Sequence, residues 1–233
     1  MHDGLIYLEN IPTNNINFRL NFSFNDWRGV MDIFKLLFIC LFALVSFNVH
    51  AFDFRVEAQA GGTDGDIEAE PLGGPNFEKG AETGAAVGGA VWLDGVLLPA
   101  LSVGAQYSYI FGNDLETDPS PDKIEFDTHV AMINVVFRDN EGTLDGKFHP
   151  YAGGGIGFSR VNAQYFLAGV EGDDIDFAGQ FMAGFDYDIL KNIYFGVNFT
   201  YLFNQAEIQA AGIPTTTYDF QTIKFMGVLG MKF

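Results

Sequence analysis

The chain has 233 residues and a formal net charge of −18, from 12 Lys and Arg against 30 Asp and Glu. This balance disfavours nucleic acid as a partner, because neutralising its phosphates requires Lys and Arg. Hydrophobic residues make up 48% of the chain, which excludes the composition of a disordered protein. No run approaches the roughly 18 apolar residues of a membrane-spanning helix, so a membrane protein of this sequence would cross as a barrel.

The N-terminal part of the chain is separate from the predicted fold. Residues 1–30 are rich in Asn and show no clear period, and we interpret them as a start-site artefact or a disordered leader. Residues 31–51 have the layout of a signal peptide, with Lys35 before an apolar run over 36–47 and a small-residue site ending at Ala51. We expect export and cleavage after Ala51.

The chain contains a single cysteine, Cys40, inside that apolar run. Phe38 and Ile39 precede it, whereas lipoprotein processing requires small residues there. We therefore expect a mature domain over 52–233 without a disulfide framework.

Alternation of large apolar residues is clearest over 193–203, read IYFGVNFTYLF. Every second residue from Ile193 to Phe203 is bulky and apolar, while Asn198 and Thr200 lie at intervening positions. A period of two predicts a β-strand with one apolar and one mixed face. Such a strand is typical of a barrel wall between lipid and a polar interior.

In chain order, the same alternation predicts eight strands, of which the second has an ambiguous inward face. They cover 52–60, 83–93, 98–111, 124–138, 150–160, 177–187, 193–203 and a last strand ending at Phe233. Acidic segments predicted as long loops lie at 61–82, 112–123, 161–176 and 205–216. The even strand number, and the alternation of these long loops with shorter turns, predict an all-β fold, an eight-stranded antiparallel up-and-down transmembrane β-barrel.

Eight strands enclose an interior that side chains can fill, so we expect a plugged lumen. The polar network predicted there consists of Asp53, Arg55, Glu57, Asp186, Lys224 and Lys232. Because the first and last strands must be neighbours when the barrel closes, Lys224 or Lys232 should lie near the acidic residues of the first strand. The glycines Gly153, Gly155 and Gly157 share one parity and predict close approach or curvature.

Three segments carry a resemblance to a known family: HPYAGGGIGFSR at 149–160, GFDYDILKNIYFGVNFTYLF at 184–203 and the terminal GMKF. The chain over 52–233 resembles the small eight-stranded outer-membrane β-barrels, which include opacity-type surface proteins and the transmembrane domain of OmpA-like proteins. The resemblance implies a Gram-negative outer membrane, contact with its lipid and lipopolysaccharide, and a C-terminal signal for the barrel-assembly machinery. The matching signal residues are Phe225, Leu229, Met231 and Phe233.

The predicted mature domain contains two histidines, which are candidates for catalysis. His129 shares a strand face with Glu125 and Asp127, but a lipid A deacylase would need a serine where Ala131 stands, so we interpret His129 as a polar rim residue. His149 falls in a predicted turn and is interpreted as structural.

The run Asp64, Asp66, Glu68 and Glu70 could hold a hard cation, although it lacks the EF-hand pattern, and a solvated loop is the simpler interpretation. A ligand-stacking role is open to a set of tyrosines near strand ends, for which an interface girdle is the favoured interpretation: Tyr107, Tyr109, Tyr187 and Tyr201.

The sequence therefore predicts a non-enzymatic outer-membrane protein, without metal or cofactor, that has a structural or surface-interaction role and an extracellular partner reached through its acidic loops. Three alternatives remain open. One is a narrow pore or transporter for small solutes, another is a lipid A-modifying enzyme, and the third is a soluble barrel with its bulky face inward.

Overall fold

The structure is a computed structural model, and it describes residues 53–71, 77–80, 83–117, 122–165, 170–209 and 215–233. The expectations for residues 1–30, the signal peptide at 31–51 and cleavage after Ala51 concern residues outside these ranges. No helix with the length and hydropathy needed to cross a membrane occurs in the described part of the chain.

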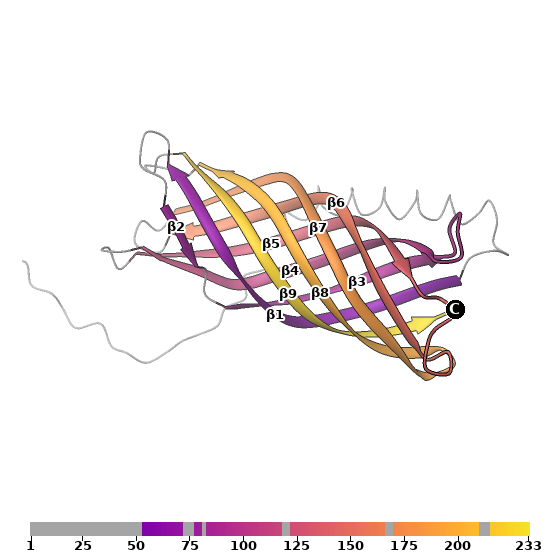
Figure 1. Cartoon of the computed structure of the whole chain (residues 1–233). Helices are drawn as coiled ribbons and strands as arrows, with labels where there is room; N and C mark the ends of the chain where they lie inside the picture. The colour runs from indigo at the N-terminus through magenta and orange to yellow at the C-terminus, as the bar shows by residue number, and fades with distance from the viewer. Residues whose placement is uncertain (1–52, 72–76, 81–82, 118–121, 166–169, 210–214) are drawn as a thin grey trace, which may run out of the picture. The chain divides into compact units, whose positions relative to one another are not determined.

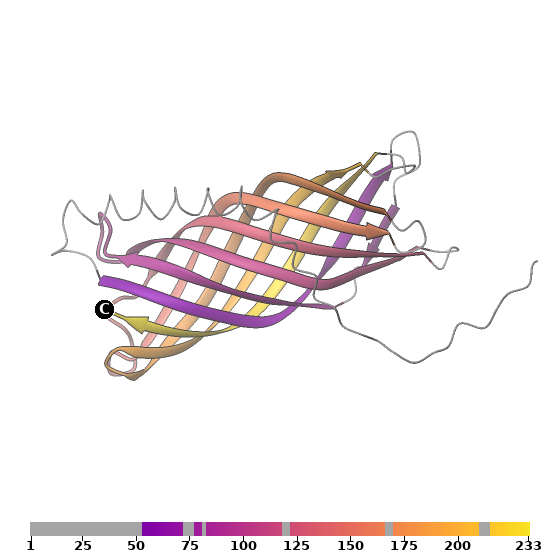
Figure 2. The ribbon, with the colours of Figure 1, turned by 180° about the vertical axis from the view of Figure 1, so that it is seen from behind.

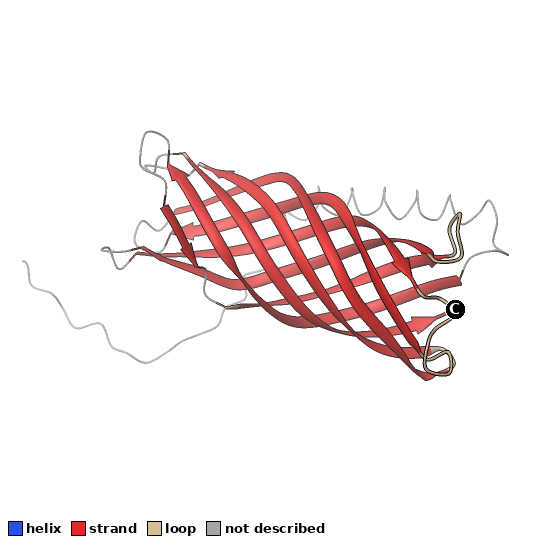
Figure 3. Ribbon diagram, in the orientation of Figure 1, coloured by secondary structure: helices blue, strands red, loops and turns tan. Residues whose placement is uncertain are grey.

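The described residues form one antiparallel sheet that closes on itself (Figures 1, 2 and 3). Its strands are β1 (Asp53–Pro71), β2 (Phe77–Gly80), β3 (Gly84–Asp94), β4 (Leu101–Thr117), β5 (Asp122–Arg138), β6 (Phe148–Tyr165), β7 (Val170–Leu190), β8 (Ile193–Ile208) and β9 (Thr216–Lys232). The eight strands other than β2 form the predicted ring, and β2 is a short strand paired with β1.

Closure is made by β1 and β9, which pair from Arg55 opposite Lys232 to Pro71 opposite Thr216. The prediction that the first and last strands are neighbours is therefore confirmed. Three turns, at 95–100, 139–147 and 191–192, lie at the end of the barrel that carries the C-terminus (Figures 1 and 3). We call it the turn end, and the opposite end the hairpin end.

Near the turn end, alternate apolar side chains point away from the barrel axis. The exposed fractions of Phe195, Phe199 and Phe225 are 45%, 46% and 62%. Their neighbours in sequence point inward and are buried, as Asn198 and Lys224 show. This orientation is opposite to that of a soluble barrel with its bulky face inward. In β3, whose parity the sequence left ambiguous, Ala86, Ala90 and Trp92 are the buried, inward residues.

The strands continue well beyond the predicted ends. Residue 71 ends β1, residue 117 ends β4, and β7 begins at residue 170. The prediction of long loops at 61–82, 112–123, 161–176 and 205–216 is therefore wrong for most of these residues. A transmembrane strand needs about 9–11 residues, whereas β7 has 21, so the extra length forms sheet beyond the apolar band.

In these extensions the polarity of the two faces is reversed. Asp64 and Asp66 of β1 are exposed on the outward face, while Ile67 and Ala69 are buried inside. On β9, Gln221 is exposed and Phe220 is buried. The inward residues of this part form a cluster of Ile67, Ala69, Ile124, Phe126, Val161, Ala163, Tyr165, Ala206, Ile208, Tyr218 and Phe220, which we call the outer core.

The reversal coincides with a change in strand pairing. The ladder between β7 and β8 reaches Ala178 opposite Asn204, after which the described part of β7 pairs with β6 and that of β8 with β9. On the other side, the β3–β4 ladder ends at Ala85 opposite Phe111, and β2 pairs with β1. Beyond the apolar band, the wall thus consists of two sheets, β4 to β7 and β8-β9-β1-β2, which face each other across the outer core.

Candidate functional site

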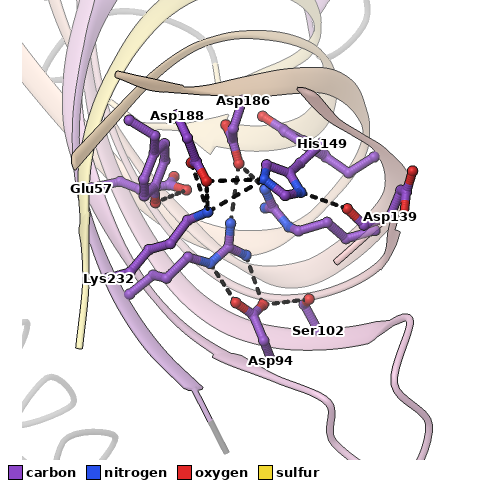
Figure 4. Close-up of polar contacts among 12 residues, drawn as sticks. Glu57, Asp94, Ser102, Asp139, His149, Asp186, Asp188 and Lys232 are labelled. Carbon is purple, nitrogen blue, oxygen red and sulfur yellow. Dashed lines mark hydrogen bonds and ion pairs between the residues drawn. The ribbon is translucent and has the colours of Figure 1, made fainter. Parts of the chain in front are cut away.

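The interior near the turn end is filled by a polar network that begins on β1 (Figure 4). Arg55 pairs with Asp94 of β3, with 2.6 Å between Nε and Oδ2 and 2.7 Å between Nη2 and Oδ1. Ser102 of β4 donates a hydrogen bond of 2.6 Å to Asp94 Oδ1. All three side chains are buried. The charges of Arg55 and Asp94 compensate each other there, as buried charges require.

Asp186 of β7 connects this pair to β5. Its Oδ2 lies 3.1 Å from Arg55 Nη1 and also pairs with Nη1 of Arg138. The Arg138 guanidinium lies 4.2 Å from the ring centre of Tyr151 and 5.6 Å from that of Trp92. Two arginines and two carboxylates from four strands therefore hold opposite walls of the barrel together.

A chain of amides extends the network toward the hairpin end. Gln59 donates to Glu57 Oε2 at 2.9 Å and accepts from Gln106 at 2.8 Å. Gln106 Oε1 in turn accepts from Asn134 at 3.0 Å and from Gln180 at 2.8 Å. These hydrogen bonds cross the interior between β1, β4, β5 and β7. The buried amide side chains therefore find their partners in one another.

A second ionic group closes the turn end. His149 Nδ1 donates to the carbonyl oxygen of Asp139 at 2.8 Å, and Nε2 lies 3.2 Å from Asp188 Oδ2 (Figure 4). Lys232 of β9 is 2.7 Å from Asp188 Oδ1 and 3.5 Å from His149 Nε2. The group links β6, β7 and β9, so the interpretation of His149 as structural fits its surroundings.

Lys224 lies apart from these ion pairs. Its side chain is 1% exposed, and Nζ donates to Ser108 Oγ at 3.3 Å. In the β1–β9 ladder it stands opposite Thr63. Lys224 or Lys232 was expected near the acidic residues of the first strand. Lys232 stands opposite Arg55 in the β1–β9 ladder, and its ion pair is with Asp188 of β7.

The predicted network residues are thus mostly enclosed, with one exception. Arg55, Glu57, Asp186 and Lys224 are buried, and Lys232 is partly buried. Asp53 is exposed at the first residue of β1, so its predicted place in the lumen is wrong. The first residue of a strand lies at the barrel rim, where the inward face meets solvent.

Several interior residues were missing from the predicted network. Asp94 lies just outside the strand predicted over 83–93, and Arg138, Tyr151 and Tyr194 had no predicted role. Asp94 and Arg138 continue the inward parity of their strands, two residues beyond Trp92 and two beyond buried Val136. Extending the inward–outward alternation to the last residue of each strand would have identified Asp94 and Arg138 as interior residues.

The inward glycines of β6 mark close approach, as predicted. A Cβ at Gly155 would collide with Asn134 Oδ1, and one at Gly157 with the carbonyl oxygen of Ala131. The interior beside β6 is therefore occupied by atoms of β5.

The outward face of the extensions is acidic. Exposed or partly exposed carboxylates there are Asp64, Asp66, Glu68, Glu70, Glu125, Asp127, Glu171, Asp173, Glu207 and Asp219. Glu68 stands directly opposite Asp219 in the β1–β9 ladder. In the described ranges, no three His, Cys, Asp or Glu side chains form a group that could hold a metal ion.

His129 lies on the outer surface of the wall. Tyr107 Oη is 2.7 Å from its Nδ1, and the ring of Tyr109 stacks on it at 4.7 Å between centres. Phe111 stacks on Tyr109 at 5.4 Å. This aromatic stack lies at the border of the apolar band, where a girdle of interfacial aromatic residues is expected.

Comparison with known proteins agrees with this architecture. Residues 36–232 match the family described as outer membrane protein beta-barrel domain. No curated protein matches the chain.

Among solved structures, the outer membrane protein OprG from Pseudomonas aeruginosa is similar in fold at 16% identity and a TM-score of 0.51, covering 78% of this chain and 96% of that one. Neisserial surface protein A matches at 13% identity and a TM-score of 0.46, over 77% and 97% of the two chains. The outer membrane protease OmpT from Escherichia coli matches at 9% identity and a TM-score of 0.42, over 78% and 98%.

Proposed function

Because the chain belongs to the outer membrane protein beta-barrel domain family, we propose that it is a non-enzymatic outer-membrane protein with a closed lumen and a surface-interaction role. Within this proposal, the exposed apolar band faces lipid. The turn end faces the periplasm and the hairpin end faces outward, because short turns are periplasmic in such barrels.

The observation that supports a closed lumen is the presence of buried side chains in the interior toward both ends of the barrel. Near the turn end, Arg55, Asp94, Asp186 and Arg138 cross the barrel in paired contacts. Toward the hairpin end, the outer core closes the space between the two facing sheets. Ions would have to displace compensated buried charges first and apolar side chains next, and both steps are costly.

The observation that supports a surface role is the acidic outward face of the extensions. These carboxylates lie beyond the apolar band, where they stay hydrated and accessible from outside the cell. Side chains of this charge favour a cationic partner through electrostatic complementarity.

Conductance in planar lipid bilayers tests the closed lumen. The purified chain should insert without steady single-channel current, under conditions in which a porin in the same bilayer conducts. Reproducible open-channel current from the wild-type chain would overturn the closed-lumen proposal in favour of a pore for small solutes.

Adhesion of intact cells tests the surface role. Cells that display the protein should attach to a polylysine surface more strongly than cells carrying Glu68→Gln, Glu70→Gln, Glu207→Gln and Asp219→Asn together. A matched control carries Glu141→Gln and Asp145→Asn in the 139–147 turn, on the periplasmic side, and should attach as the wild type does. Equal attachment of all three strains would contradict an interaction through the acidic face.

A further inference from the structure

Two of the three turns at the turn end expose a leucine, and the third follows exposed aliphatic residues at the end of β7. Leu97 is 90% exposed and Leu144 is 71% exposed. Ile189 and Leu190, beside the third turn, are 55% and 61% exposed. Exposed apolar side chains that adjoin a lipid-facing band are candidates for membrane contact.

Two of these leucines also adopt a backbone conformation that disfavours them. The φ angles are +66° at Leu97 and +52° at Leu144, in the left-handed region where glycine or asparagine is usual. Glycine occupies comparable positions nearby, at Gly95, Gly142 and Gly146. At a positive φ angle, leucine is less favourable than glycine, and its exposed side chain is less favourably hydrated than a polar one. We therefore expect the leucine side chain to make a contact that offsets both costs.

The turn tips continue an interface that is already present. Leu101 follows the first turn and opens the outward face of β4, and Phe137 on β5, 63% exposed, precedes the second. Ile193 begins β8 directly after the third turn. At the same rim, aromatic pairs such as Phe54–Phe233 and Phe148–Phe185 face outward, with ring centres 5.9 Å and 5.1 Å apart.

We propose that these turns insert Leu97, Leu144 and Leu190 into the boundary between headgroups and acyl chains of the periplasmic phospholipid leaflet. The occupant is phospholipid because the tips adjoin the lipid-facing band on three sides of the barrel. The turns carry exposed charges of both signs, Lys147 and Lys191 against Glu141 and Asp145, so apolar burial rather than net charge draws them to the lipid. The tips thereby fix the depth of the barrel in the membrane, whether or not its lumen conducts.

A depth-resolved fluorescence experiment tests the proposal on the full chain. In a Cys40→Ser background, Leu97→Cys, Leu144→Cys and Leu190→Cys are each labelled with the environment-sensitive dye NBD and refolded into phosphatidylcholine vesicles. Because both leaflets of these vesicles are phospholipid, the direction of insertion does not affect the result. Gln164→Cys, on the exposed outward face of the β6 extension, is the matched control.

Insertion predicts a blue-shifted emission at the turn tips relative to residue 164, and stronger quenching by phospholipids that carry a spin label near the headgroup than by dissolved iodide. Residue 164 should show the reverse order. Turn-tip probes with the spectrum and iodide quenching of residue 164 would overturn the proposal and indicate a periplasmic protein partner or none. Heat-modifiable gel mobility identifies folded variants, and three independent sites keep the test decisive when one of them does not fold.

Discussion

Asp174 Oδ2 accepts a hydrogen bond of 2.7 Å from the backbone N–H of Glu207, across the place where β7 and β8 cease to pair. A side chain here replaces the backbone acceptor that a continued ladder would provide. Among the described residues, this carboxylate contact bridges the seam between the two outer sheets, so Asp174 should be sensitive to substitution.

Asp174→Ala should speed hydrogen exchange at the Glu207 amide by about fivefold, which corresponds to the loss of a hydrogen bond of about 1 kcal/mol. Asp174→Asn keeps an acceptor oxygen and should have a smaller effect. Exchange measured by NMR in micelles checks both variants. Unchanged exchange in the alanine variant would show that another group satisfies this amide.

Arg55→Met should destabilise the barrel by about 3–5 kcal/mol, because it leaves the buried carboxylates of Asp94 and Asp186 without one of their cations. Arg160→Met is the control: Arg160 pairs with Asp173 at 3.1 Å in an exposed setting, and its loss should cost about 1 kcal/mol or less. Urea unfolding in vesicles, followed by heat-modifiable gel mobility, measures both. Equal losses of unfolding free energy in the two variants would contradict a polar network that is buried from water.

Ile67→Ala tests the outer core in a segment whose sequence predicts a loop. Ile67 is 2% exposed, so the substitution should leave a cavity and cost about 2–5 kcal/mol. Asp66→Ala, the adjacent outward residue, should change the free energy of unfolding by about 0.5 kcal/mol or less. A negligible effect of Ile67→Ala in the same unfolding assay would restore the loop interpretation.

Phe225→Arg and Gln221→Arg compare two outward positions of β9 on either side of the polarity change. The arginine at 225 enters the apolar band and should cost about 2–4 kcal/mol, falling to about 0–1 kcal/mol near the interface. At 221, where glutamine is already exposed, the cost should be at the low end of this range. Equal costs would show that the border of the lipid band lies elsewhere.

Glu68→Gln should raise stability, since Glu68 faces Asp219 in the β1–β9 ladder and like charges in register repel. The expected gain is about 0.2–1 kcal/mol, and it should shrink as salt screens the pair. The unfolding midpoint at low and high ionic strength measures it. A loss of stability would reveal that Glu68 makes a favourable contact.

The ring of eight strands could be predicted from sequence because the lipid-facing residues alternate without interruption, as over Ile193 to Phe203. The extensions could not be predicted in the same way. There Asp64, Asp66 and Glu68 occupy the outward positions, and acidic residues close to glycines resemble a loop. In β1 the reversed alternation was present, but only Ile67 and Ala69 marked its apolar face.

The interior was partly predictable for a related reason. Inward parity identifies Arg55, Glu57 and Asp186, but it does not say which strands bring their partners. The strong tilt of the strands, visible in Figure 1, places Lys232 against Asp188 of β7 rather than against an acid of β1. Such pairings depend on the stagger of the whole barrel.

Accessibility of spin labels along the outward face of β9 tests the reversal of polarity most directly. Single labels at residues 217, 219, 221, 223, 225, 227, 229 and 231 in vesicles should separate into two groups. Labels from 223 to 231 should collide with dissolved oxygen, which concentrates in lipid, and those from 217 to 221 with a water-soluble nickel chelate. Accessibility of labels at 225 and 229 to the nickel chelate, or its absence at 217 and 219, would contradict the account. The account requires the outward face of β9 to meet lipid near the turn end and water near the hairpin end.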